Sequence, residues 1–359
     1  MTAYFHLDRP DNMIGVYHDY SCIAEGLLSL GIVCFGNIDM CQTEAQGDFL
    51  IKHDKHFDMK DADFVFFHYV MYRDNYSKAN ETIQTITGIP NRRFRVFFID
   101  SSDGVRTPGF SKGGHSCDVV LKSHYNRKYN YPPNFTPWQF GLTKRIINAI
   151  HPAPFHERDN SILVNFRVKH QLRDYVSTLI RPIVENCFLW DNQTNGFTSA
   201  GLEGNDFHYW HKTGGRHFPQ YYNKLSCTKL CACYGGVFAL PWGNYNKYTA
   251  KIIRQLNDIF KVSKWDRVRQ WDSWRLWEAW VAGCCVIHID FEKYGCVLPV
   301  MPENGVHYIG LDIENMEKFE YQLNGDIGTI ADNGRKFALD NYSPIKIGLA
   351  CLALLRKVK

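Results

Sequence analysis

The segment QWDSWRLWEAWVAGCCVIHIDF, from Gln270 to Phe291, places an arginine and a glutamate three residues apart on an expected helix. Asp272 or Ser273 is a suitable N-cap, and a glycine follows the last apolar residue of the helical pattern. Because residues three apart share a helix face, Arg275 and Glu278 are expected to point the same way. A helix N-terminus attracts phosphate, an arginine there adds a bidentate partner, and a glutamate one turn further can accept the hydroxyl protons of a ribose. An ordinary surface ion pair on a half-buried helix is the alternative explanation.

A second group of basic residues follows an expected strand in the middle of the chain. In SILVNFRVKHQLRD, the apolar run Ile162–Phe166 leads into a turn that carries Arg167, Lys169 and Arg173. Ligands on parallel sheets bind beyond the carboxyl ends of the strands, so this position favours a binding role. A solvated, charged loop is the alternative explanation for the same residues.

Two groups of side chains have metal-binding chemistry but lack a suitable spacing. They are the thiols of CTKLCAC and a set of histidines, namely Cys227, Cys231, Cys233, His170, His208, His211 and His217. The thiol spacing matches neither the paired C-x2-C pattern of zinc sites nor the common iron–sulfur patterns. The histidines have no well-placed acidic or cysteine partner. We therefore expect structural, buried thiols and no metal site.

The elements that must position these residues alternate between short apolar runs and helical patterns. DADFVFFHYV, RFRVFFID and CDVVLKSHY are expected strands of the first half, and CCVIHID is one of the second. This alternation predicts an α/β fold with parallel sheets. A proline-rich stretch between them predicts two domains, 1–150 and 151–340, that face a cleft, with a final apolar helix in 341–359.

The composition narrows the class of protein. The 359 residues are 45% apolar and 22% charged, as in soluble globular proteins. The formal net charge of +4, without a clustered basic stripe, disfavours a nucleic-acid partner but leaves one open. We see no signal peptide and no apolar run of the roughly 18 residues that a membrane span needs. With twelve cysteines, these features predict free thiols and a reducing, cytoplasmic location.

Three consecutive segments of the second half resemble the donor-binding domain of GT-B glycosyltransferases, in particular exostosin-like and family-one-like enzymes. DSWRLWEAWVAGCCVI resembles their donor-binding helix, YYNKLSCTKLCACYGG the helix–strand unit before it, and ENGVHYIGLDIENM the segment after it. The resemblance spans Tyr221 to Leu323 and implies two Rossmann-like domains. One departure is Val286, eight residues after Glu278, since many retaining enzymes of this fold carry two glutamates at that spacing.

The resemblance implies a glycosyltransferase that uses a nucleotide sugar, such as a UDP- or GDP-sugar, without a metal or other cofactor. The second domain would bind the donor and the first would face the acceptor. In such folds the last helix commonly packs back on the first domain, although a basic, apolar helix could also contact a membrane surface. The donor-binding residues implied in this way are Arg167, Lys169, Arg173, Tyr234, Ser273, Arg275 and Glu278.

An inverting enzyme also needs a base that deprotonates the acceptor hydroxyl. RVFFIDSSDG resembles the strand-plus-acid segment that carries the base in several inverting GT-B enzymes, including the phage DNA glucosyltransferases. Asp100 is our first candidate, and Asp103 and His18 follow. A turn or capping role is the alternative for Asp100, and capping or packing is the alternative for His18.

Lys122, His124 and Arg127 end another expected strand and are predicted to hold an acceptor or a donor phosphate. The acceptor would be a glycan, a lipid-linked or a small molecule. A catalytically silent nucleotide- or sugar-binding protein and a DNA-modifying glucosyltransferase remain as alternatives, and so does another two-domain sugar enzyme.

Overall fold

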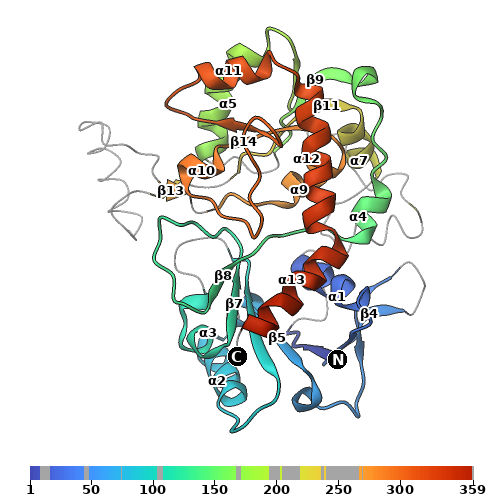
Figure 1. The fold of residues 1–359 in the computed structure, drawn as a ribbon, viewed down its shortest axis with the longest axis vertical. Helices are drawn as coiled ribbons and strands as arrows, with labels where there is room; N and C mark the ends of the chain where they lie inside the picture. Colours follow the sequence, from blue (N-terminus) through green and yellow to red (C-terminus); the bar gives the residue numbers. More distant parts are fainter. Residues whose placement is uncertain are drawn as a thin grey trace.

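The strands of the chain form two large sheets, one in each half of the molecule (Figure 1). The computed structural model describes residues 1–8, 17–43, 48–73, 75–102, 108–166, 171–193, 203, 219–235, 238–239, 267–268 and 270–357. The first sheet has eight strands in the order β3-β4-β2-β1-β5-β6-β7-β8, and the second has five in the order β10-β9-β11-β14-β15. Within these sheets the pairs are parallel, except that β3 runs antiparallel to β4.

The first domain contains short strands and the helices that connect them. Its strands are β1 (Thr2–Phe5), β2 (Val33–Gly36), β3 (Met40–Gln42), β4 (Phe49–His53), β5 (Phe64–His68), β6 (Arg95–Asp100), β7 (Val119–Lys122) and β8 (Phe135–Pro137). Its α-helices are α1 (His18–Leu28), α2 (Tyr76–Thr87) and α3 (Lys112–Ser116). The 3-10 turns are η1 (Met59–Asp61), η2 (Tyr69–Tyr72) and η3 (Pro108–Phe110).

Helices cover both faces of the first sheet. The alternating directions of the side chains along β5 show why both faces need cover. Side chains of neighbouring strand residues point to opposite faces, and all five residues of β5 are buried. Phe64 and Phe66 belong to the core beneath α1 and the last helix, whereas Val65 and Phe67 belong to the core beneath α2. An apolar strand without polar alternation is typical of a parallel sheet covered on both sides.

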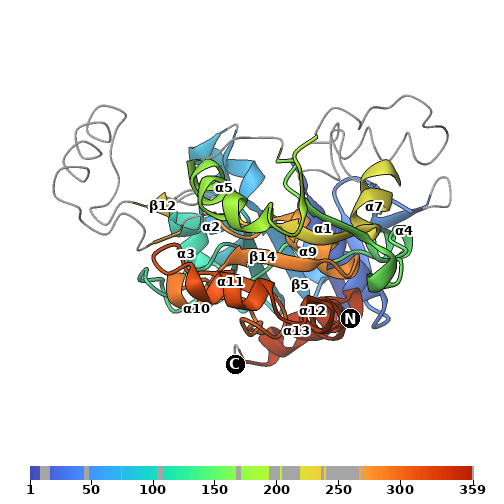
Figure 2. The ribbon, with the colours of Figure 1, turned by 90° about the horizontal axis from the view of Figure 1, so that it is seen from above.

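The second domain begins after a connecting segment with α4 (Lys144–Ala149) and η4 (Phe155–Glu157). Its strands are β9 (Asp159–Leu163), β10 (Leu189–Asp191), β11 (Thr228–Ala232), β14 (Cys285–Ile289) and β15 (Ile309–Leu311), with a separate antiparallel pair of β12 (Phe238–Ala239) and β13 (Arg267–Val268). Its helices are α5 (Gln171–Val184), α7 (Pro219–Ser226), α9 (Trp274–Val281), α10 (Phe291–Tyr294), α11 (Glu317–Leu323) and α12 (Ile327–Tyr342). In Figure 2, α5 and α7 lie on one side of β14 and α10 and α11 on the other.

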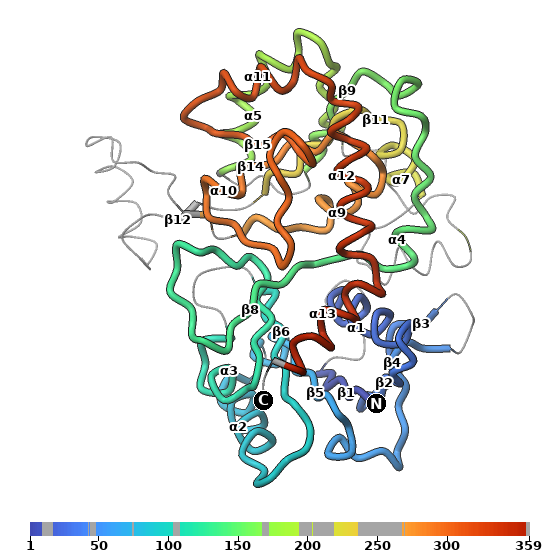
Figure 3. The backbone as a smooth tube through the Cα atoms, viewed as in Figure 1, coloured from blue at the N-terminus to red at the C-terminus, as the bar shows by residue number. Residues whose placement is uncertain are grey.

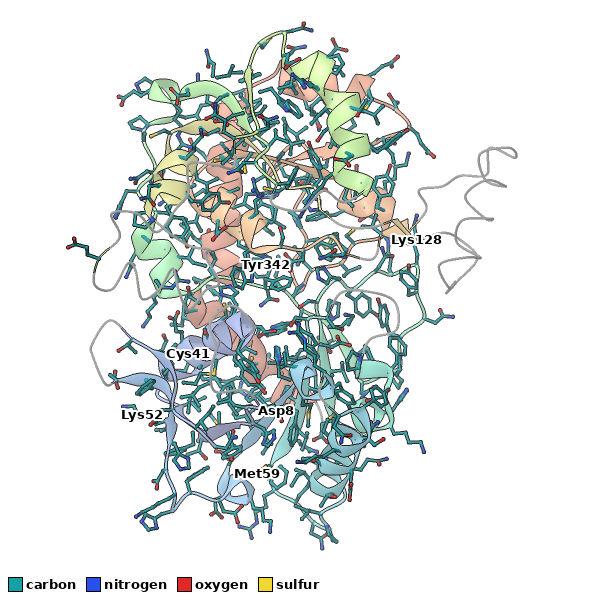
Figure 4. The ribbon with its side chains drawn as sticks, turned by 180° about the vertical axis from the view of Figure 1, so that it is seen from behind. Asp8, Cys41, Lys52, Met59, Lys128 and Tyr342 are labelled. Atoms are coloured by element: carbon teal, nitrogen blue, oxygen red, sulfur yellow. The ribbon has the colours of Figure 1, made fainter. Side chains whose placement is uncertain are left out.

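The chain returns to the first domain at its end. Helix α12 runs along the second domain, and α13 (Pro344–Lys357) then packs beside α1 (Figure 3). Two glycines allow this close approach, because a Cβ atom on Gly348 would lie 2.4 Å from the carbonyl oxygen of Gly26. Tyr342, which Figure 4 labels near the level where the domains meet, packs its ring against Trp277 in a tilted arrangement, with ring centroids 4.5 Å apart.

Candidate functional site

Helix α9 carries Arg275 in its first turn, at the edge of the second sheet. A helix that connects parallel strands runs antiparallel to them, so the N-termini of α5 and α9 lie at the carboxyl edge of the sheet. There the Arg275 guanidinium donates to the Asn165 side chain at 2.7 Å and to the Asn165 carbonyl oxygen at 2.8 Å. Asn165 lies two residues beyond the end of β9 and is 4% exposed, so Arg275 is fixed close to the end of that strand.

A second arginine shares the same aromatic neighbour. The Arg173 guanidinium lies 4.5 Å from the centroid of the Phe166 ring, and the Arg275 guanidinium lies 4.9 Å from it. The ring of Tyr234, which follows β11, is 5.2 Å from the Phe166 ring, and its hydroxyl is 3.0 Å from the Ser177 hydroxyl. We call Arg173, Arg275, Asn165, Phe166 and Tyr234 the arginine cluster.

The cluster combines two positive side chains with two helix N-termini. Burial alone would lower the pKa of Arg275, but the neighbouring Tyr221 and the thiols of Cys231 and Cys233 raise it above its ordinary value. The guanidinium therefore keeps its charge. Backbone N–H groups at a helix N-terminus and a bidentate arginine both favour an oxyanion, so the arrangement suits phosphate groups.

The structure places the remaining predicted residues of α9 differently. Ser273 occupies the N-cap position with extended backbone angles, but its side chain makes no capping hydrogen bond. Glu278 is 4% exposed and accepts a 3.4 Å hydrogen bond from the Tyr222 hydroxyl. A ribose at Glu278 would have to compete with Tyr222, so the ribose role of Glu278 stays a prediction.

Some predicted residues lie outside the described part of the chain. They are Asp103, Arg167, Lys169, His170, His208, His211 and His217. Among the residues that are described, no group of three or more His, Cys, Asp or Glu side chains could hold a metal ion. The thiols of Cys231 and Cys233 are buried, with their sulfur atoms 3.8 Å apart. The expectation of a buried thiol was wrong for Cys227, which is exposed after the end of α7.

Asp100, the first candidate for the base, is fully buried, and its carboxylate is hydrogen-bonded within its own domain. Its Oδ1 accepts from the Ser102 hydroxyl at 2.5 Å and lies 3.4 Å from the Lys122 ammonium, and its Oδ2 accepts from the Gly109 backbone at 2.9 Å. The carboxylate thus ties the end of β6 to β7 and η3. Lys122, which was predicted to hold a phosphate, is 2% exposed, and its ammonium group pairs with Asp100.

His18 lies where α1 of the first domain meets α9 of the second. Its ring centroid is 4.7 Å from that of Trp274, the residue before Arg275, and its Nε2 is 3.2 Å from the Gly141 carbonyl oxygen. If Nε2 donates to that oxygen, Nδ1 is the nitrogen that can accept a proton. Of the described candidates for the base, His18 is therefore the one beside the helix that carries Arg275.

A neighbouring carboxylate, Asp19, was missed from the sequence. It accepts from His68 at 3.0 Å and from the Ser101 hydroxyl at 2.6 Å, which joins α1 to the ends of β5 and β6. Burial raises the pKa of Asp19, but His68 and Ser101 outweigh it and hold that pKa below its ordinary value. The available signal was a polar residue at or directly after the end of each strand, His68 for β5 and Ser101 for β6, but the sequence does not show that they meet Asp19.

The other two predicted acceptor residues contact the second domain. Arg127 forms an ion pair with Glu292, and its side chain is 49% exposed. His124 accepts hydrogen bonds from the backbone of Trp271 and Asp272. Since both side chains have protein partners, their roles toward an acceptor remain predictions.

Among the described residues, no helix has the length and apolar character needed to cross a membrane. No family model matches the chain, and no curated protein matches it in sequence.

Solved structures match the fold over nearly the whole chain. An α-glucosyltransferase in complex with UDP-glucose and DNA containing an abasic site has a TM-score of 0.52 at 10% identity, over 99% of both chains. HepE from Anabaena, in complex with UDP and glucose, has a TM-score of 0.52 at 11% identity, over 99% of this chain and 100% of the other. Identities this low establish the fold alone. The chain therefore has the two-domain GT-B fold of these glycosyltransferases, as its sequence predicts.

Proposed function

We propose that the protein transfers a sugar from a nucleotide sugar, with UDP as the first nucleotide to test, to an acceptor hydroxyl group. The observation that carries this proposal is the arginine cluster, two arginines at helix N-termini on the carboxyl edge of the second sheet. It is supported by the GT-B fold and by the UDP or UDP-glucose named in the matching complexes.

In this proposal Arg173 and Arg275 bind the diphosphate of the donor. Cleavage of the glycosidic bond leaves negative charge on the diphosphate, and fixed cations aimed at that charge stabilise the transition state. Asn165 holds the Arg275 guanidinium through two hydrogen bonds, so its orientation is set before the donor binds. Ser273 and Tyr234 border the same site, and Glu278 is assigned to the ribose.

For an inverting reaction, we assign His18 as the group that accepts the proton of the acceptor hydroxyl. The assignment is supported by its ring contact with Trp274, the residue before Arg275 on α9. Asp100 is the competing assignment, but its carboxylate oxygens accept bonds from Ser102 and Gly109. His18→Gln and Asp100→Asn separate the two, because loss of the true base lowers kcat while UDP binding persists.

The acceptor is proposed to be a glycan, a lipid-linked molecule or a small molecule. DNA is a second candidate acceptor, since one matching α-glucosyltransferase was solved with UDP and a 13-mer DNA containing an HMU base. The formal net charge of +4 gives only weak support to a DNA acceptor, because phosphate-backbone binding requires many basic contacts.

The direct test is calorimetric titration with UDP, followed by turnover of a panel of UDP- and GDP-sugars. We expect Arg173→Ala and Arg275→Lys to weaken UDP binding about tenfold or more, since one charge-assisted hydrogen bond contributes about 1.5–3 kcal/mol. Arg181→Ala is the matched control, because Arg181 lies on the same helix as Arg173 but pairs with Glu185 at the surface. A chain that binds neither UDP nor any nucleotide sugar would refute the proposal, and binding without turnover of any donor would identify a silent binding protein.

A further inference from the structure

One side chain of the first domain holds the backbone turn that precedes α9. Nδ1 of His124 accepts from the backbone N–H of Trp271 at 3.2 Å and from that of Asp272 at 3.1 Å. His124 follows β7 and is 3% exposed, so these bonds lie in the interior of the domain junction. A nitrogen that accepts from N–H groups carries no proton, so the ring is in its neutral form.

Asp272 connects the same turn to the segment that joins the two domains. Its Oδ2 accepts from the Phe140 backbone at 2.8 Å, and its Oδ1 accepts from the indole N–H of Trp277 at 2.8 Å. Asp272 is 3% exposed. The turn is therefore bound to the first domain through His124 and to the connecting segment through Phe140, while Trp277 joins it to α9.

The backbone of His124 also marks this position as unusual. Its φ angle is +55°, in the left-handed region that few residues other than glycine adopt. Backbone strain of this kind persists where surrounding contacts enforce it, and it clusters at functional positions. Here the contacts that accompany it are the two hydrogen bonds to the turn.

We propose that His124 is a positioning residue, which fixes the amino-terminal turn of α9 against the first domain and so sets where Arg275 meets the donor. Arg275 lies only three residues beyond Asp272, within the first turn of the helix. The inference rests on the proposed function for the donor, but the placement of the turn can be measured without any donor. His124 thereby acts through α9 rather than by contact with an acceptor.

The test compares two variants that differ in the acceptor atom. His124→Asn keeps an oxygen at the position of Nδ1, counted in bonds from the backbone, and asparagine tolerates the left-handed region. His124→Ala removes the acceptor, and His124→Gln moves it one bond further and serves as the second variant if His124→Ala does not fold. Asn126→Ala is the matched control, because the Asn126 amide donates to the carbonyl oxygens of Val268 and Tyr294 and so also joins the domains, but it does not bond the N–H groups of Trp271 and Asp272.

The readout is amide hydrogen exchange of Trp271 and Asp272 in the full chain, together with UDP affinity. We expect exchange at least tenfold faster in His124→Ala, and within about threefold of the wild-type rate in His124→Asn and Asn126→Ala. UDP affinity should fall about tenfold in His124→Ala and recover in His124→Asn. Unchanged exchange in His124→Ala, or equal acceleration in Asn126→Ala, would overturn the inference. A wild-type chain without UDP affinity refutes the proposed function instead, and the exchange rates then still decide whether His124 holds the turn.

Discussion

Glu25 is predicted to make the protein less stable as the pH rises from about 4.5 to about 7. This carboxyl group on α1 is 9% exposed, and its Oε2 accepts from the Lys144 backbone at 2.6 Å. Burial raises its pKa from an ordinary 4.5 to about 7, although the hydrogen bond from Lys144 and the charge of Arg145 act in the opposite direction. Folding therefore favours the protonated form.

The sign follows from proton linkage. Between about pH 4.5 and pH 7 the folded state binds more protons at Glu25 than the unfolded state, so the free energy of unfolding decreases as the pH rises. The contribution is fully present below the ordinary pKa and is lost as the pH passes through the folded-state pKa. Relative to a pH well below 4.5, the free energy of unfolding is lower by about 3 kcal/mol at pH 8 and by less than about 1 kcal/mol at pH 5.

Glu25→Gln removes the ionisation and keeps an oxygen that can accept from Lys144. We expect the variant to match the wild type at pH 5 within about 1 kcal/mol and to exceed it at pH 8 by about 3 kcal/mol, or about 4 °C in Tm for a chain of this length. Thermal melting at both pH values measures this, with Glu81→Gln on the exposed face of α2 as the control. A Glu25→Gln variant whose difference from wild type is the same at both pH values would show that this reasoning is wrong.

Three further predictions concern packing, a buried pair and the thiols. Gly348→Ala puts a methyl group 2.4 Å from the Gly26 carbonyl oxygen, so the free energy of unfolding in urea should fall by about 1–3 kcal/mol. Asp19→Asn should destabilise the fold by about 3 kcal/mol at pH 7, and this difference should shrink in acid as the wild-type carboxylate is protonated, since its folded-state pKa is lowered. In a thiol titration of the folded protein, Cys187 and Cys227 should react rapidly, and the other ten cysteines only after unfolding.

The sequence predicted the fold class because apolar runs of the sheets are distinct along the chain. The expected strands DADFVFFHYV and CCVIHID appear as β5 and β14. Two of the elements that the sequence analysis missed show the physical reasons. β1 has only four residues at the chain start, and α12 combines a weakly apolar face with three polar or glycine positions at Asp332–Gly334. Short or polar patterns carry little periodic signal, although packing in the folded chain stabilises them.

The candidate site was predictable only in part. Strand ends and helix starts are visible in the sequence, so Arg173 and Arg275 could be assigned to one edge of the second sheet. The pairing of polar groups depends on the register between neighbouring strands, and this register cannot be read from the sequence. Asp100 and Lys122 illustrate this, because β6 and β7 pair them directly and bury both.

The segment that joins the domains donates backbone hydrogen bonds to two buried carboxyl groups whose pKa values are raised. Asp272 accepts from Phe140 and Glu25 from Lys144, four residues apart on that segment, and burial raises the pKa of Asp272 to about 7 as well. The two carboxyl groups nevertheless connect the segment to different elements. Glu25 joins the segment to α1, whereas Asp272 joins it to the turn before α9.

Glu25→Gln should therefore change the pH dependence of stability and leave amide exchange at Asp272 within about threefold of wild type. If Glu25→Gln accelerated that exchange as strongly as His124→Ala does, the segment and the α9 turn would form a single cooperative unit. Placement of Arg275 would then be a property of the whole domain junction, and His124 would have no separate role in it.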